Sequence, residues 1–541
     1  MGTLSPQPSG GLDVSDGATG ETSDRRLALL LAMAMFVFVI DTSLMNVSIS
    51  AVVRDLDTTV SSVQSAVAIE ALVSAAFILI GSKVGDLFGR KRAYVVGLLL
   101  YVSGALAMVV AQDLAAIIVF WAVIGGLGAS LYLPAMQSLI HGNFQGTAQA
   151  KAYALVGASA AIAAAIGPLL GGFLTTYLSW RVGFALEAVI IAIVLLGSRR
   201  LLRDVPYTGD RGVDKVGSVL SVLGMGGLVL GILAWQEGGE SVGALLAAGL
   251  TAMGALAYWL LRRKREGKPV LLDPHLFESR LFSFGISQGI LQQVALGGML
   301  IALPIYLQMV LDYNAMQAGL SLAPLSLTMF AVALVAGRMA GKRRPSSLIL
   351  AGFALLLAAM ALLIPIVPRA DSGWYLVVPL MLAGAGLGLL VSQLNNYTLS
   401  PISEKRVGEA AGVNSATGSF GLSLGLAFGG AIMLAALSIA FTQKSEASNV
   451  LSPPEQQRVA DALEDDAQVM SNAQLEELLA GQPEDVREEI VSINTDARPL
   501  ALQVALLVPF LAALIGLFAS FRMLRLPDPT PSAAVEGVAL G

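Results

Sequence analysis

The sequence has no cysteine and only two histidines among its 541 residues. Without cysteine, the chain cannot form disulfides, iron–sulfur clusters or thiolate zinc sites. His141 and His275 alone offer little for a histidine-built metal site or a Ser-His-Asp triad. We therefore expect no metal, no bound cofactor and no enzyme activity.

Charged residues are also scarce, at 13% of the chain, whereas about 25% is usual in a soluble domain. The net charge of −5 indicates no basic domain for nucleic acid. Hydrophobic residues make up 55%. At ~20 residues for each membrane-spanning helix, this is enough for about fourteen spans.

Fourteen apolar runs have the length needed to cross a bilayer. Each must be helical, because lipid offers no hydrogen-bond partner to an unpaired backbone amide. The runs cover about 27–50, 62–82, 93–111, 113–137, 152–177, 180–198, 216–235, 242–261, 282–310, 317–337, 346–367, 374–396, 409–441 and 499–521.

The distribution of basic residues supports this number of spans. With the N-terminus inside, 26 of the 33 Lys and Arg fall in inner segments, as the positive-inside rule requires. Miscounting one span would destroy the asymmetry. We therefore predict a multi-pass protein of the cell (inner) membrane with both termini cytoplasmic.

The two ends of the chain and one long acidic segment near the C-terminus lie outside the runs. Residues 1–24 lack the basic start and cleavage site of a signal peptide, and we expect disordered cytoplasmic tails at 1–24 and 526–541. The acidic segment 442–498 predicts an extracytoplasmic helical insert, with an amphipathic helix from Pro453 to Ala480. It is interpreted as a solvated cap, with gating or partner contact as the alternative.

The loop between the second and third runs carries a glycine-rich basic motif that favours a tight turn and close helix contact. It resembles the signature G-x-x-x-G-D-x-x-G-R-K of the major facilitator superfamily. That resemblance implies an all-α membrane protein with the major facilitator fold, in which this loop holds the inner gate. The alternative is a basic loop that only sets topology. The residues are Gly81, Gly85, Asp86, Gly89, Arg90 and Lys91.

The fifth run resembles the antiporter motif G-P-x-x-G-G of the drug-efflux branches. Pro168 permits a kink, and the flanking glycines permit close packing. The earlier glycine of the family motif is Ala163 here. A plain kinked packing helix is the alternative. The candidate motif residues are Gly157, Gly167, Pro168, Gly171 and Gly172.

Three further stretches resemble the fourteen-span drug:proton antiporter branch. Residues 41–47 match D-x-x-x-x-N-V, residues 179–181 match S-W-R, and residues 306–324 match Y-L-Q…A-G-L…P. One stretch departs from the branch: where helix four usually has R-x-x-Q-G-x-G, this chain has Ala122 and Gly125 in place of arginine and glutamine. The arginine tied to proton coupling in the family is therefore missing.

Three carboxylates fall inside predicted spans, ~10–14 Å below the outer surface by helical rise. An ionisable group there costs several kcal/mol unless paired, protonated or hydrated. Burial without a cationic partner favours the protonated carboxyl, which can then exchange protons near neutral pH. Structural hydrogen bonds, for Asp41 through Asn46, are the alternative. The candidates for proton coupling and substrate contact are Asp41, Glu70 and Glu187.

The ninth run adds polar candidates for substrate contact. Gln288 and Gln292 are one turn apart on a helix and share a face with each other, and Gln293 follows. Interhelical hydrogen bonding is the alternative. Trp121, Tyr132 and Met136 are interpreted chiefly as core packing.

These observations predict two six-helix bundles, 27–198 and 282–521, that flank an inserted helix pair at 216–261. We expect a monomeric secondary active transporter, surrounded by membrane lipids, that exports hydrophobic or cationic small molecules by proton antiport and alternating access. The proton is the coupling ion, and no nucleic acid takes part. The alternative is an exporter or flippase of a lipid-like envelope molecule without the usual proton relay.

Overall fold

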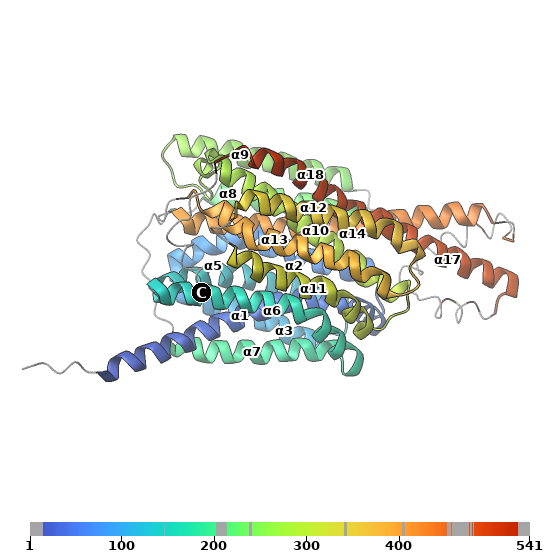
Figure 1. Cartoon of the computed structure of the whole chain (residues 1–541), viewed down its shortest axis with the longest axis horizontal. Helices are drawn as coiled ribbons and strands as arrows, with labels where there is room; N and C mark the ends of the chain where they lie inside the picture. Colours follow the sequence, from blue (N-terminus) through green and yellow to red (C-terminus); the bar gives the residue numbers. More distant parts are fainter. Residues whose placement is uncertain are drawn as a thin grey trace, which may run out of the picture.

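The computed structural model describes residues 14–144, 146–201, 212, 214–236, 241–339, 343–402, 406–448, 450–451, 456, 475, 479 and 481–527. Every regular segment in these residues is helical. Fourteen helical stretches within them are long and apolar enough to cross a membrane. In Figure 1 they run side by side along the long axis of the molecule. The predicted all-α fold with fourteen spans is confirmed.

We refer to the first six spans as the N-terminal half, following the predicted division of the chain. The fourth span begins as a short helix, continues as a π-helix and ends as an α-helix. The elements are α1 (Val14–Leu56), α2 (Val60–Phe88), α3 (Arg90–Val110), α4 (Leu114–Ala116), the π-helical η1 (Ile117–Gly125), α5 (Gly126–Asn143), α6 (Gly146–Tyr177) and α7 (Trp180–Leu201).

The inserted pair and the C-terminal half follow. The inserted pair is α8 (Lys215–Gln236) and α9 (Val242–Arg265). The remaining elements are η2 (Pro274–Glu278), α10 (Arg280–Met309), α11 (Ala315–Arg338), α12 (Pro345–Ile366), η3 (Val367–Arg369), η4 (Gly373–Leu376), α13 (Val377–Leu399), α14 (Val407–Glu446), α17 (Glu484–Ala505) and α18 (Leu507–Met523). We call the end with the Gly81–Lys91 loop the inner end and the opposite end the outer end, following the predicted sidedness.

The inserted pair packs against the interface between the two halves, because α8 contacts both α2 and α14. Met225 and Val229 of α8 belong to the same apolar core as these helices. A buried carboxylate fixes the pair at the inner end. Asp214 accepts hydrogen bonds from the Trp259 indole at 2.9 Å and from the Gly217 amide at 2.9 Å.

A second carboxylate ties the inserted pair to the C-terminal half. Asp273 lies 2.9 Å from Lys264 of α9 and 2.9 Å from Arg406, which precedes α14. Partial burial opposes its ionisation. The hydrogen bonds from Lys264 and the His275 amide, together with Arg406, nevertheless hold the pKa of Asp273 below its usual value. The two ion pairs of Asp273 therefore link the inner ends of α9 and α14.

Helix bounds differ from the apolar runs where amphipathic or polar sequence continues a helix. α1 begins at Val14, inside the segment 1–24 that was predicted to be disordered. The first span already forms a helix, and each residue added to an existing helix gains one backbone hydrogen bond, so the helix can extend beyond the apolar run. α14 continues to Glu446 and α17 begins at Glu484. Figure 1 shows these two helices projecting together beyond the ends of the others.

The ends of the predicted insert 442–498 are therefore extensions of spanning helices. The inward face of α17 explains its extension, since Ile490, Ile493 and Ala497 are buried at helical spacing. The predicted helix from Pro453 to Ala480 lies outside the described residues, apart from isolated positions. The 526–541 tail lies outside them from residue 528.

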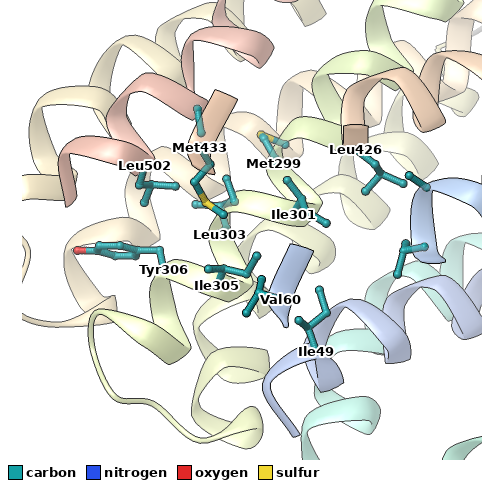
Figure 2. Packing of buried hydrophobic residues seen from close by; sticks show 14 of the residues in the cluster. Ile49, Val60, Met299, Ile301, Leu303, Ile305, Tyr306, Leu426, Met433 and Leu502 are labelled. Carbon is teal, nitrogen blue, oxygen red and sulfur yellow. The ribbon is translucent and has the colours of Figure 1, made fainter. Parts of the chain in front are cut away.

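The outer ends of the two halves are in contact. Gln308 of α10 donates to the Val47 carbonyl of α1 at 3.1 Å, and the Met316 amide of α11 donates to the Thr176 hydroxyl of α6 at 2.9 Å. Figure 2 shows the apolar packing at this level, with Val60 beside Ile305. The two halves therefore pack directly against each other at the outer end.

Candidate functional site

Asp41 occupies the centre of the N-terminal half. Its side chain is only 2% exposed. The Tyr101 hydroxyl of α3 donates to one carboxylate oxygen at 2.5 Å. The indole N–H of Trp121 donates to both oxygens, at 3.1 and 3.2 Å. Asn46 bonds instead to the Thr42 carbonyl at 2.7 Å, so the sequence-based alternative of an Asp41–Asn46 contact is not what the structure contains.

Glu70 and Glu187 join Asp41 in one acidic cluster. Both are buried, and both interact electrostatically with Asp41. Neither oxygen of Glu187 has a hydrogen-bond partner within the described part of the chain. None of the ion pairs formed by the described residues includes any of the three acids. The structure thus brings together three carboxyl groups from α1, α2 and α7, and none of them forms an ion pair with a described residue.

The π-helix of the fourth span positions the indole that contacts the cluster. Trp121 lies within η1, and the next residue, Ala122, stands where the family usually has arginine. π-Helical turns are rare and are frequently found at functional sites. Trp121 was interpreted as core packing. Its place beside the missing arginine was the signal that could have marked it as a partner of Asp41.

Aromatic rings enclose the cluster on the inner side. Tyr132 of α5 packs edge-on against Tyr101, with ring centroids 5.6 Å apart, and it makes similar contacts with Tyr94 and Phe38. Tyr101 and Tyr132 are both almost fully buried. The acids therefore lie in the interior of one half rather than at the contact between the halves.

The three glutamines of α10 have different surroundings. Gln288 is fully buried and donates from its amide nitrogen to the Gly516 carbonyl at 3.0 Å and to the Ser520 hydroxyl at 2.9 Å. These contacts agree with the alternative that Gln288 forms hydrogen bonds between helices. Gln292 is buried at 7% exposure, and Gln293 lies against α14 at Gly421. Substrate contact remains a prediction for these residues.

The inner loop motif forms a compact turn. Gly89 joins α2 to α3 with a φ of +98°, a conformation that L side chains rarely adopt. Arg90 donates to Asp86 at 3.2 Å from two nitrogens, and Lys91 donates to the Arg199 carbonyl at the end of α7 at 3.1 Å. A Cβ at Gly81 would collide with the Ser130 carbonyl of α5.

Gly85 of the same motif packs near Ala93, the first turn of α3. The motif therefore holds together the inner ends of α2, α3, α5 and α7.

The predicted antiporter motif lies at the contact of α6 with α1 and α11. Gly167 and Gly171 pack against α1, at Ser43 and Leu44. A Cβ at Gly172 would collide with the Ala315 carbonyl of α11. Across the same contact, a Cβ at Gly319 would collide with the Pro168 carbonyl. Gly157 differs, because a Cβ there would meet nothing within 4 Å.

The S-W-R stretch fastens the outer end of α7. The Trp180 indole donates to Asp55 at 3.0 Å, and Arg181 forms an ion pair with the same carboxylate. Arg181 also stacks on Trp180, 4.4 Å from the ring centroid. The stretch therefore joins the start of α7 to the end of α1.

Fourteen helices that can cross a membrane define a multi-pass membrane protein, and sequence comparison identifies the family. The profile of the Major Facilitator Superfamily matches residues 31–426. The chain belongs to this superfamily and is a multi-pass membrane protein with fourteen spans.

Its relatives include resistance and export proteins of bacteria. The chain is 29% identical to a puromycin resistance protein of Streptomyces alboniger over 408 residues, which cover 74% of this chain and 80% of that protein. It is 30% identical to a cephamycin export protein of Amycolatopsis lactamdurans over 426 residues, covering 76% and 85%.

Solved structures share the fold. A bacterial homologue of the human lysosomal transporter Spinster, crystallised in an inward-facing and unoccupied conformation, aligns with a TM-score of 0.63 at 12% identity. The alignment covers 93% of this chain and 98% of that chain.

Proposed function

We propose that the protein exports hydrophobic or cationic small molecules in exchange for protons by alternating access. The observation that carries the proposal is the cluster of Asp41, Glu70 and Glu187, which are buried and form no ion pair among the described residues. The relatives named for antibiotic resistance and export support the direction of transport.

The cluster supplies a physical basis for proton binding. Three carboxyl groups in a medium of low polarity cannot all be ionised at once, since like charges repel strongly there. The donors Tyr101 and Trp121 stabilise a negative charge on Asp41 in particular. The cluster therefore holds at least one proton, which leaves when helix movement admits water.

The acids lie inside the N-terminal half. A proton that binds to them therefore alters the packing of the helices in that half. Asp41 links α1 to α3 and to the π-helix. α1 also contacts α10 and α11 of the other half. A change in the charge of Asp41 thus changes the packing of the helix that closes the outer side.

The charge distribution supports the proposed sidedness. We place the protein in the bacterial inner membrane with both termini cytoplasmic, since the basic residues concentrate at that end. Single-cysteine labelling of this cysteine-free chain from either side tests the orientation. The protein is expected to work as a monomer.

A second candidate keeps the fold and changes the cargo to a lipid-like envelope molecule. Two observations favour it. Helix four carries Ala122 where the antiporters have arginine, and the outer end contains an apolar pocket between the halves.

Transport in proteoliposomes separates the candidates. We expect an ethidium-type cation, and not a fluorescent phospholipid, to move when a pH gradient is imposed. Asp41→Asn and Glu70→Gln should abolish that pH-driven movement, while the control Glu266→Gln, at a solvent-exposed loop carboxylate, should retain it. Movement of the phospholipid alone would favour the second candidate.

A further inference from the structure

The inserted helix pair has a polar inner end that the acidic cluster does not explain. The side chain of Asp214 is fully buried, and one of its oxygens accepts the hydrogen bonds from Trp259 and Gly217. The other oxygen accepts a hydrogen bond from the Leu271 amide at 3.3 Å, and Arg263 lies 3.8 Å from the carboxylate. A buried carboxylate bonded at both oxygens holds its partners in one geometry. The inner ends of α8 and α9 and the segment after α9 therefore form one unit.

A second set of charged groups attaches this unit to the C-terminal half. Lys264 and Arg406 both form ion pairs with Asp273. The Asp273 amide also donates to the Glu409 carboxylate of α14 at 2.8 Å. A single exposed ion pair contributes little, but a network of charged hydrogen bonds fixes both direction and distance. We call these four residues the inner clamp.

The contact of the inserted pair with the N-terminal half is of a different kind. Leu79 and Ile80 of α2 pack against Leu256 and Leu260 of α9, and α8 contacts α2 as well. The hydrogen bonds and ion pairs of the described residues 214–236 and 241–265 stay within those ranges or go to residues 266–273. Apolar contact is non-directional, so the surface shared with α2 can slide.

We propose that the inserted pair is a moving part of the C-terminal half, in which the inner clamp carries α8 and α9 along with α14 while their apolar face slides over α2. α8 contacts both α2 and α14, and these two helices also contact each other. The pair therefore keeps this contact between the halves covered as the halves rock. The inference rests on the proposed alternating access for the movement, and on the contacts of the described residues for the clamp.

Distances between three spin labels on the full-length protein in lipid nanodiscs test the proposal. The chain has no native cysteine, so labels attach only where cysteine is introduced. The sites are the exposed residues Val96 on α3, Leu261 on α9 and Ser347 on α12. Double electron–electron resonance measures each pair of labels at acidic and at alkaline pH, with and without an ethidium-type cation.

The three distances show which half the inserted pair follows. When the Val96–Ser347 distance changes, we expect the Leu261–Val96 distance to change with it and the Leu261–Ser347 distance to stay constant. A constant Leu261–Val96 distance with a changing Leu261–Ser347 distance would place the pair with the N-terminal half and overturn the proposal. Changes in all three distances would also overturn it, because the pair would then move independently.

Two variants test the clamp whether or not the halves move. Asp273→Asn removes the charge that Lys264 and Arg406 share, so the Leu261–Ser347 pair should lose its single narrow distance and populate longer ones. Lys264→Gln releases α9 but keeps the ion pair between Asp273 and Arg406. It should have the same effect, which decides the matter even if Asp273→Asn misfolds.

Glu266→Gln is the matched control in the same segment. It removes exposed ion pairs to Arg262 and Lys268 that lie outside the clamp, and it should keep the wild-type distances. A narrow, unchanged Leu261–Ser347 distance in both clamp variants would overturn the proposal. A constant distance between the halves under every condition would contradict alternating access instead, and the clamp variants would then decide how the pair is attached.

Discussion

Asp41 accepts hydrogen bonds from two side chains that no motif marked. Tyr101 and Trp121 both donate to its carboxylate, and neither carries a full charge. The family arginine would neutralise a carboxylate in this region, whereas hydrogen-bond donors stabilise the charge and leave the net charge of the cluster negative. At the residue scale, the proposed proton exchange would therefore depend on these hydrogen-bond donors rather than on an ion pair.

Trp121→Phe tests this arrangement. The substitution keeps an aromatic ring in the buried space but removes the indole N–H that contacts Asp41. We expect pH-driven export to fall by about tenfold, since a hydrogen bond to a charged group contributes ~1.5–3 kcal/mol. Initial rates of cation export in proteoliposomes measure the effect. The control Trp235→Phe alters an exposed indole, and an equal loss in both variants would contradict the role of Trp121.

Glu187→Leu separates stability from function at the unpartnered carboxyl. Both of its oxygens are buried without hydrogen bonds in the described residues, which costs ~1–3 kcal/mol per orphaned group. Leucine has a similar volume, so we expect a higher thermal unfolding midpoint together with slower pH-driven export. A stabilised variant that exports at the wild-type rate would remove Glu187 from the coupling site.

At the scale of elements, glycine spacing determines where helices approach closely. Gly172 and Gly319 lie where α6 meets α11, and a Cβ at either would strike a backbone carbonyl. Gly157, at the start of the same motif, faces open space. The sequence motif marks Gly157 and Gly172 equally, and only packing distinguishes them.

Gly172→Ala and Gly157→Ala form a matched pair. The added methyl group of Gly172→Ala would push α6 away from α11, which should lower the free energy of unfolding by ~1–3 kcal/mol. Because this change weakens the contact between the halves at the outer end, we expect slower export. Gly157→Ala should transport normally and gain ~0.5–1 kcal/mol, because alanine favours the helix. Thermal unfolding and export rates measure both. Equal unfolding midpoints and export rates in the two variants would show that close packing of α6 against α11 is not required for stability or export.

The sequence predicted the elements better than their details. Fourteen apolar runs fixed the number of spans, because each run satisfies the length that a bilayer requires. The π-helix at Ile117–Gly125 was not predictable, since its residues read as an ordinary apolar span. The outward extension of α17 was missed because its amphipathic face depends on packing against α14.

The three acids were predicted as candidates from their depth, but their meeting in one cluster required the tertiary structure. Gln288 shows the opposite case. Its spacing suggested a surface shared with Gln292, yet α18 supplies acceptors for its amide. Pattern identifies polar residues inside spans, and it does not identify their partners.

At the scale of the whole molecule, the proposed alternating access requires the contact between the halves at the outer end to open. Thr176 and Met316 meet across the halves, and the chain has no native cysteine. The double variant Thr176→Cys/Met316→Cys should form a disulfide that holds the outer side closed and stops export, with recovery on reduction. Each single variant serves as a control, and full export by the oxidised double variant would contradict outer opening.

Proton movement driven by cargo tests the central claim most directly. Proteoliposomes containing wild-type protein or Asp41→Asn receive a gradient of an ethidium-type cation, and an enclosed pH-sensitive dye reports proton flux. We predict that cargo flow moves protons in the opposite direction in the wild type, while Asp41→Asn exchanges labelled cargo without moving protons. Proton flux in Asp41→Asn equal to that of the wild type would contradict the account.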